Sequence, residues 1–156
     1  MQTAIFGAGC FWGVELTFSQ LPGVVATEVG YSGGQTTHPT YDDICSGTTG
    51  HTEVVRVTFD PGQVSYQELV TKFFTLHDPT QLNRQGPDIG HQYRSVILTA
   101  DAEQDRTARA VRTQLSAENR YAHPIVTAIE PAPTFWAAEA YHQQYLAKQG
   151  RGTCRV

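Results

Sequence analysis

A cysteine followed by two aromatic residues is the part of this sequence best suited to chemistry. It is Cys10, within the glycine-flanked motif of residues 9–13, and Phe11 and Trp12 come directly after it. An apolar, strand-like run over residues 3–8 precedes it, and a helix-like run follows. Because a helix N-terminus stabilises the reactive thiolate without a metal, Cys10 is a candidate nucleophile in an apolar, shape-selective neighbourhood. The leading interpretation is an enzyme.

Several familiar sites are excluded by spacing. The glycines in and before the motif miss the dinucleotide-binding spacing by one residue, and there is no Walker lysine. A cysteine phosphatase loop needs an arginine six residues after Cys10, where this chain has Leu16. Cys45 and Cys154 form no Cys-x-x-Cys pair, and no histidine supplies a ligand pair, so a metal site is not expected. A Cys–His acyl-transfer hydrolase is left open, because its partners meet in space rather than in sequence.

Length and composition set the broad class. The chain has 156 residues and a formal net charge of −4, which predicts one catalytic domain over residues 1–156 with a flexible tail at residues 149–156. No basic patch or long apolar run stands out, so neither nucleic acid nor a membrane is expected as a partner. Three widely spaced cysteines and the lack of a signal-peptide pattern predict a cytoplasmic protein.

Strand and helix patterns alternate along the chain without a linker. The strands expected are residues 3–8, 24–31, 51–60, 93–99 and 125–129, and the helices are residues 11–21, 66–77, 101–119 and 135–148. Two polar, glycine-containing loops, residues 32–50 and 80–92, are long enough to suggest function. The order contains the split βαβ unit of ferredoxin-like folds. We therefore expect an α+β two-layer sandwich with a mixed or antiparallel sheet and an extra C-terminal helix. A non-enzymatic binding module of this fold is a further alternative.

Four blocks, in order and over nearly the whole chain, resemble the A-type peptide methionine sulfoxide reductases. The blocks are Gly9-Cys10-Phe11-Trp12-Gly13; Tyr41, Cys45-Ser46-Gly47, Thr49-Gly50-His51 and Glu53; Gln85-Gly86, Asp88, Gly90 and Gln92-Tyr93-Arg94-Ser95; and Ala138-Glu139, Tyr141-His142-Gln143 and Tyr145-Leu146. The resemblance implies thiol-dependent reduction of methionine S-sulfoxide, free or in proteins, by a monomer that needs no metal or organic cofactor.

The same resemblance implies roles for three residues in the reaction. Cys10 is the nucleophile that becomes a sulfenic acid, and Glu53 is the acid that protonates the sulfoxide oxygen, which requires burial to raise its pKa. Cys154 is the resolving cysteine, which forms a disulfide with Cys10 that thioredoxin, or dithiothreitol in its place, reduces. The chain departs from the family here, because the usual Asn-Pro-x-Gly-Tyr-Cys context is replaced by Gly-Arg-Gly-Thr-Cys.

Five further residues are implied to bind the substrate. Phe11 and Trp12 would hold its methyl group, although Phe11 also lies on the inward face of the expected helix. Tyr41, Asp88 and Tyr93 would surround the oxygen and its water, although an aspartate in such a loop is also typical of a turn.

The remaining polar residues of the blocks are assigned supporting roles. We expect His51, Arg94 and Glu139 to be structural or orienting, His142 to pack in the interior, and Cys45 to be a buried structural thiol.

Overall fold

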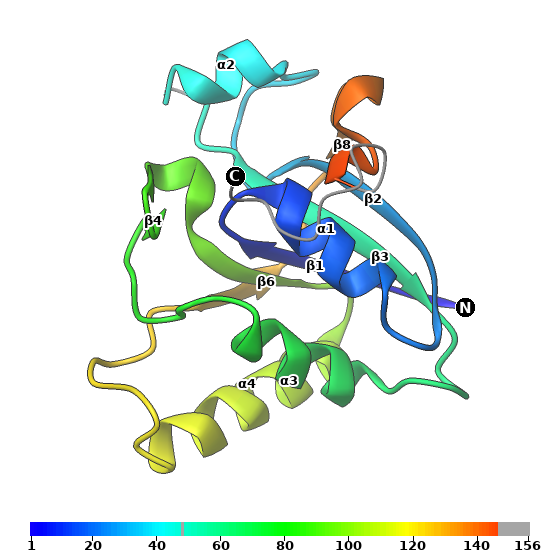
Figure 1. Cartoon of the computed structure of the whole chain (residues 1–156), viewed down its shortest axis with the longest axis vertical. Helices are drawn as coiled ribbons and strands as arrows, with labels where there is room; N and C mark the ends of the chain where they lie inside the picture. The colour runs from blue at the N-terminus through cyan, green and yellow to red at the C-terminus, as the bar shows by residue number, and fades with distance from the viewer. Residues whose placement is uncertain (48, 147–156) are drawn as a thin grey trace.

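The computed structural model describes residues 1–47 and 49–146 (Figure 1). The strands are β1 (Gln2–Ala8), β2 (Val24–Ser32), β3 (Thr52–Phe59), β4 (Arg84–Gln85), β5 (Asp88–Ile89), β6 (Ser95–Thr99), β7 (Ala128–Pro131) and β8 (Trp136–Ala137). The helices are α1 (Phe11–Ser19), α2 (Tyr41–Cys45), α3 (Tyr66–Thr75) and α4 (Ala102–Ala117), with 3-10 turns η1 (His91–Tyr93) and η2 (Ala140–His142).

Six of these strands form one mixed sheet, in the order β7-β6-β1-β3-β2-β8. The pairs are antiparallel except β6–β7, which is parallel. Strand β3 lies between β1 and β2, so the chain crosses over β3 through α1 to pass from β1 to β2. The remaining strands, β4 and β5, form a separate hairpin. The expected α+β arrangement with a mixed sheet is confirmed.

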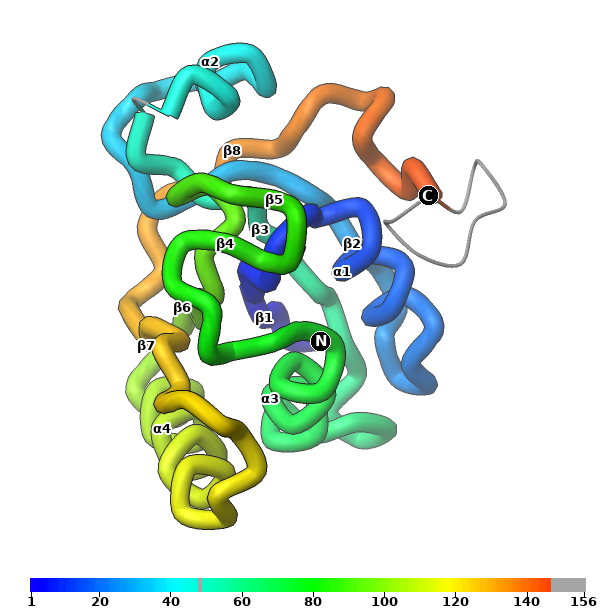
Figure 2. Tube along the Cα trace, turned by 60° about the vertical axis from the view of Figure 1, so that its left-hand side comes forward, coloured from blue at the N-terminus to red at the C-terminus, as the bar shows by residue number. Residues whose placement is uncertain are grey.

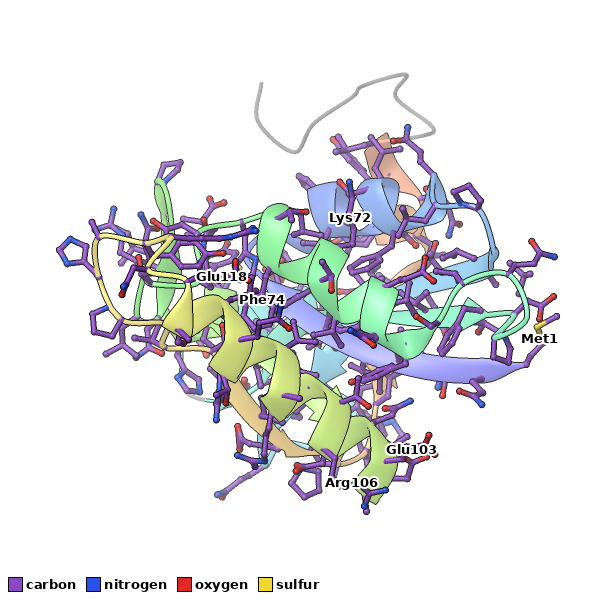
Figure 3. All side chains as sticks on the ribbon, turned by 90° about the horizontal axis from the view of Figure 1, so that it is seen from below. Met1, Lys72, Phe74, Glu103, Arg106 and Glu118 are labelled. Atoms are coloured by element: carbon purple, nitrogen blue, oxygen red, sulfur yellow. The ribbon has the colours of Figure 1, made fainter. Side chains whose placement is uncertain are left out.

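The helices build the main core on one face of the sheet. Alternate residues of β1 and β3, such as Phe6, Val55 and Val57, point into this core and meet the apolar stripes of α1, α3 and α4. Figure 3 shows α3 beside α4, with Phe74 of α3 between them. Phe6 stacks on Phe18 of α1 with ring centroids 4.9 Å apart.

The opposite face of the sheet is covered by chain that follows β7. Val54, Val96 and Leu98 form a small apolar cluster there, against which Phe135 packs. The Arg56 guanidinium lies 4.3 Å above the centre of the Phe135 ring. This segment approaches closely because Gly30 has no side chain, since a Cβ at that position would lie 2.4 Å from the Trp136 carbonyl oxygen.

Side-chain caps begin two of the helices. The Ser65 side chain accepts a hydrogen bond from the Glu68 N–H and the Glu68 carboxylate accepts one from the Ser65 N–H, which is the capping box at the start of α3. The Asp101 side chain accepts from the Gln104 N–H at the start of α4.

The expected C-terminal helix over residues 135–148 is wrong for residues 135–144, which contain β8 and η2 instead. Residues 145 and 146 are helical, and residues 147–156, including the expected tail, lie outside the described residues. The Gln143 side chain explains the difference, because its Oε1 accepts from the Val29 N–H at 2.9 Å and its Nε2 donates to the Val29 carbonyl oxygen at 2.9 Å. These contacts with β2 hold the segment extended and outweigh its helical propensity.

Smaller differences concern the loops and one strand. The expected strand at residues 125–129 lies at Ala128–Pro131 instead. The loop over residues 32–50 contains α2, which a Thr40–Asp43 capping box begins, and the loop over residues 80–92 contains the β4–β5 hairpin and part of η1. Helix α2, the β4–β5 hairpin and η1 are too short to show a hydrophobic periodicity, so a periodicity argument does not detect them.

Candidate active site

Cys10 lies at the junction between β1 and α1. It occupies the N-cap position of α1, is partly buried, and is disulfide-bonded in this structure. Gly9 before it adopts a φ of +95°, and a Cβ there would lie 2.8 Å from Cβ of Gln85 in β4. Glycine is therefore required on both conformational and steric grounds. The close approach brings the β4–β5 hairpin beside the start of α1 (Figure 2).

Glu53 is the buried carboxyl of this region. Glu53 lies two and four residues before Val55 and Val57 in β3, so its side chain is on the same face of the sheet and points toward the helices. Only 2% of Glu53 is exposed. Its Oε1 accepts from the N–H of Phe11 at 3.2 Å, and its Oε2 accepts from Nε2 of Gln92 at 3.2 Å. Burial raises the pKa of Glu53 to about 8, and these two hydrogen bonds only partly oppose the rise. A proton donor thus lies next to the residue that follows Cys10.

Three further polar residues of the resemblance lie around Glu53. Burial and then the Glu53 charge raise the pKa of the Tyr93 phenol. Burial, a hydrogen bond with Cys45 and the Glu53 charge raise that of Tyr41. The Asp88 charge in turn acts on both Glu53 and Tyr93 and raises their pKa values. Segments far apart in sequence therefore bring two phenol groups, which remain protonated donors, close to one acid.

The two aromatic residues after Cys10 have different environments. Phe11 is 1% exposed and its ring packs against Tyr31 and His142, at centroid distances of 5.8 and 5.1 Å, so it belongs to the core. Trp12 is only partly buried, and it stacks on Tyr145 with ring centroids 4.0 Å apart. Trp12 is accordingly the better placed of the two to present a ring face to a ligand.

His142 holds the Trp12 indole in place. The Trp12 Nε1–H donates to His142 Nδ1 at 3.0 Å, so the ring hydrogen of a neutral His142 is on Nε2. Burial lowers the pKa of His142 and favours this neutral form. The His142 side chain is 1% exposed, as expected for a residue that packs in the interior. It also accepts the hydrogen bond from Trp12 that orients the indole ring.

Glu139 connects the C-terminal segment to the strands and to α2. Its Oε1 accepts from the Tyr31 hydroxyl at 3.0 Å, and its Oε2 accepts from the Tyr41 N–H at 2.9 Å. Burial raises the pKa of Glu139, but these hydrogen bonds outweigh it and hold the pKa below its ordinary value. Glu139 is therefore an ionised acceptor, and its hydrogen bond with the Tyr41 N–H orients Tyr41.

His51 and Arg94 support the loops around the site. His51 is buried, accepts from the Gly34 N–H at Nδ1 and lies 2.6 Å from the Thr36 carbonyl oxygen through Nε2. Arg94 donates to the carbonyl oxygens of Gly50 and His91, each at 3.3 Å. Neither side chain has a described contact with Glu53.

The structure corrects one assignment and adds one residue. Cys45 is an exposed free thiol, so its interpretation as a buried structural thiol is wrong, because Ile44 beside it supplies the buried position of α2. The sequence pattern alone assigns no role to Gln92, although Gln92 donates a hydrogen bond directly to Glu53. Its place beside Tyr93 in a motif block is the signal that could have identified it. Cys154 lies outside the described residues.

The described residues contain neither a metal-binding cluster nor a membrane-spanning helix. Over residues 1–47 and 49–146, no group of three or more His, Cys, Asp and Glu side chains is arranged to hold a metal ion. In the same part of the chain, no helix combines the length and the apolar character needed to span a membrane.

Comparison with solved structures finds the same fold in known proteins. Methionine sulfoxide reductase A of Corynebacterium diphtheriae superposes with a TM-score of 0.92 at 44% identity, covering 99% of this chain and 77% of that one. Mxr1 from Saccharomyces cerevisiae in reduced form gives a TM-score of 0.89 at 33% identity, covering 98% and 88%. Mxr1 in complex with Trx2 gives 0.65 at 23% identity, covering 92% and 84%, which bears on the fold alone.

Sequence comparison agrees with the structural one. The peptide methionine sulfoxide reductase MsrA of Methanoculleus marisnigri is 58% identical over 156 residues, covering all of this chain and 95% of that protein. A family model described as peptide methionine sulfoxide reductase matches residues 2–156. With a buried acid beside a helix-capping cysteine and near-complete coverage by both comparisons, the chain belongs to the peptide methionine sulfoxide reductase family.

Proposed function

We propose that this protein reduces methionine S-sulfoxide, free or in proteins, to methionine. One observation carries the proposal: a 2% exposed Glu53, with a pKa raised to about 8, accepts a hydrogen bond from the N–H of the residue after Cys10. A carboxyl that stays protonated at neutral pH, near a cysteine at the N-cap position of α1, supplies the acid, and the cysteine supplies the nucleophile, that sulfoxide reduction needs. Family membership favours this reaction over the hydrolase and the binding module.

In the first step the reduced Cys10 thiolate attacks the sulfoxide, and Glu53 gives its proton to the oxygen. The sulfur–oxygen bond of the substrate breaks and a sulfur–oxygen bond to Cys10 forms, so the products are methionine, a Cys10 sulfenic acid and a Glu53 carboxylate. The substrate sulfur gains two electrons and the Cys10 sulfur loses two. The balance closes with the substrate, the thiolate and one proton, so this step requires no metal or organic cofactor.

The surrounding residues orient the two unlike substituents of the sulfoxide. We assign the methyl group to the Trp12 ring, with the buried Phe11 supporting it from the core. The oxygen faces Tyr41 and Tyr93, whose protonated phenols donate hydrogen bonds to it, while Asp88 helps position its water.

In the second step the sulfenic acid is removed. The Cys154 thiol condenses with it, so that a Cys10–Cys154 disulfide and water form. Thioredoxin then reduces the disulfide by dithiol exchange. Two observations support this pairing: Cys10 is disulfide-bonded, and Cys45 carries a free thiol. The family relation to Mxr1, which has been solved in complex with Trx2, supports thioredoxin as the reductant.

We also propose the broader context of the enzyme. The chain acts as one catalytic domain and as a monomer in the cytoplasm, where the thioredoxin system keeps thiols reduced. Its fold is an elaborated ferredoxin-like sandwich, supported by the β6-β1-β3-β2 order of its antiparallel strands.

The test is a coupled assay with a methyl sulfoxide peptide and dithiothreitol. Methionine must form in step with consumed reductant, and Cys10→Ser must abolish it. Ester or amide turnover without reductant would indicate the hydrolase, and binding unaffected by Cys10→Ser would indicate the binding module.

A second assay tests the resolving cysteine. Cys154→Ser is expected to retain activity with dithiothreitol and to lose it with thioredoxin, because dithiothreitol can reduce the sulfenic acid directly. Equal activity with both reductants would remove Cys154 from the cycle.

A further inference from the structure

Gln92 is held at the edge of the site by its backbone. It lies in η1, where the Tyr93 N–H donates to the Gly90 carbonyl oxygen at 3.0 Å. Arg94 fixes the same turn by donating to the carbonyl oxygens of His91 and Gly50. The side chain of Gln92, which is partly buried, is therefore directed by a constrained turn.

The Gln92 amide contacts the acid of the proposed reaction. Its Nε2 donates to Glu53 Oε2 at 3.2 Å, while the Phe11 N–H donates to Oε1 at 3.2 Å. Each carboxyl oxygen of Glu53 thus accepts a hydrogen bond from the described part of the chain. Burial raises the pKa of the neighbouring Tyr93 phenol, and a hydrogen bond with the Gln92 side chain partly opposes this rise. Gln92 accordingly acts on the acid and on one phenol of the oxygen-binding group.

The type of donor matters because Glu53 must hold a proton and then release it. Without a donor at Oε2, burial would make the carboxyl keep its proton more tightly. A cationic donor would have the opposite effect and keep Glu53 ionised, which removes the acid. A neutral amide stabilises the carboxylate that forms while leaving the protonated form accessible.

We propose that Gln92 is a positioning residue that sets how tightly Glu53 holds its proton, through the hydrogen bond from its amide to Oε2. This inference rests on the proposed function, in which Glu53 gives its proton to the sulfoxide oxygen. Gln92 itself exchanges no proton and touches no reacting atom.

The experiment substitutes the donor in two directions. Gln92→Met keeps the length of the side chain and removes the amide, and Gln92→Lys replaces it with a cation. Prereduced enzyme is mixed with a methyl sulfoxide peptide without reductant, and the rate of methionine formation in a single turnover is followed against pH. The rate falls at alkaline pH as Glu53 ionises.

The two variants must shift this alkaline limb in opposite directions. Gln92→Met is expected to move it up by about one pH unit, because a hydrogen bond to the charged form is lost. Gln92→Lys is expected to move it down by about one unit or more, because an opposite charge favours the carboxylate. A purely structural role would lower the rate in both variants without this opposed displacement.

Gln114→Met is the matched control. Its Nε2 donates to Glu118 Oε2 at 3.3 Å on the exposed surface of α4, so an amide-to-carboxylate bond is removed away from Cys10. Its alkaline limb must coincide with that of the unmodified enzyme. An unmoved limb in Gln92→Met, or an upward shift in Gln92→Lys, overturns the proposal. Should Gln92→Met not fold, as judged by thermal unfolding, the direction of the Gln92→Lys shift decides.

An infrared titration separates this inference from the reaction itself. The C=O band of the protonated Glu53 carboxyl, identified by its loss in Glu53→Gln, is followed against pH in the unmodified enzyme and in both Gln92 variants. If no methionine forms in any protein, the proposed function fails. The infrared midpoints must still shift in the two opposite directions, and equal midpoints overturn the role of Gln92.

Discussion

Two nearly inaccessible glutamates lie on the same side of the sheet and serve different ends. Glu15 of α1 is 1% exposed and Glu53 of β3 is 2% exposed. Glu15 Oε1 accepts from the Gln144 N–H at 2.7 Å, and its Oε2 accepts from Gln144 Nε2 at 2.8 Å and from the Thr27 hydroxyl at 3.0 Å. In Glu53, Oε1 accepts from the Phe11 N–H and Oε2 accepts from Gln92 Nε2, and both distances are 3.2 Å.

The number and length of its hydrogen bonds indicate whether a buried carboxyl has a structural or a chemical role. Short hydrogen bonds from several donors fix the segments that supply them, so Glu15 attaches the C-terminal segment to α1. Few and longer hydrogen bonds leave the cost of burying a charge largely uncompensated. Glu53 therefore remains protonated near neutral pH, at the expense of stability, and has a proton to give.

Replacing Glu53 should lower the rate of turnover more than replacing Glu15 or His142. Glu53→Gln keeps the shape and the acceptor for the Phe11 N–H but removes the acidic proton, so the rate of methionine formation should fall about 10²–10⁴-fold. The measurement is single-turnover methionine formation by the reduced enzyme. A rate within a factor of three of the unmodified enzyme would assign proton donation to another group and end the comparison.

Glu15 should show the reverse pattern. Glu15→Leu removes the acceptor of the Gln144 N–H and amide and of the Thr27 hydroxyl, which join the C-terminal segment and β2 to α1, and this should lower the free energy of unfolding by about 1–3 kcal/mol. Urea unfolding followed by circular dichroism measures this. The folded fraction should retain the pH profile of the unmodified enzyme. A shifted profile with unchanged stability would mean that Glu15, too, acts on the chemistry.

The pH dependence of stability should distinguish the two carboxyls further. Burial raises the folded-state pKa of Glu53 from 4.5 to about 8, so between these pH values the unfolded chain ionises this group while the folded chain keeps its proton. Stability contributed by Glu53 is therefore fully present below pH 4.5 and decreases until about pH 8. Relative to the unmodified enzyme, Glu53→Gln should gain roughly 5 kcal/mol of unfolding free energy across this window, because each pKa unit of the shift corresponds to about 1.4 kcal/mol.

Urea unfolding of both proteins at a series of pH values checks this, because titrating groups other than Glu53 largely cancel in the difference. A difference that is constant with pH, or that falls as pH rises, would show that the folded-state pKa of Glu53 is not raised.

The sequence was sufficient for the placement of Glu53 but not for that of Glu15. Strand alternation puts Glu53 in register with Val55 and Val57, so its inward direction follows from a period of two. Glu15 follows Phe11 by one helical turn and lies on the same buried face, yet a glutamate is usually exposed, and one of its two partners, Gln144, lies 129 positions away. Composition cannot reveal such a distant donor.

Long-range contacts also explain the two clear errors. The segment after residue 135 has helical composition, but the Gln143 amide pairs with β2 and the Glu139 carboxylate with Tyr31. Cysteine is usually buried, but in the short helix α2 the inward position belongs to Ile44, so Cys45 faces solvent. In the first case contacts with distant strands favour an extended segment over a helix. In the second, the packing of Ile44 into the core determines that Cys45 is exposed.

The smallest expected effect concerns the segment that serves both glutamates. His142 lies two residues before Gln144, so one short stretch of chain positions Trp12 at the site and binds Glu15 in the core. His142→Phe preserves the ring but leaves the Trp12 indole N–H without its acceptor. The KM for a methyl sulfoxide peptide should rise roughly fivefold, about 1 kcal/mol, with little change in kcat, because the ring that holds the methyl group loses its fixed orientation. Stability should fall far less than in Glu15→Leu, since Gln144 keeps its bonds. Steady-state kinetics with dithiothreitol test this, and a KM that stays unchanged while kcat falls would place His142 with Glu53 in the chemistry instead of with Trp12 in binding.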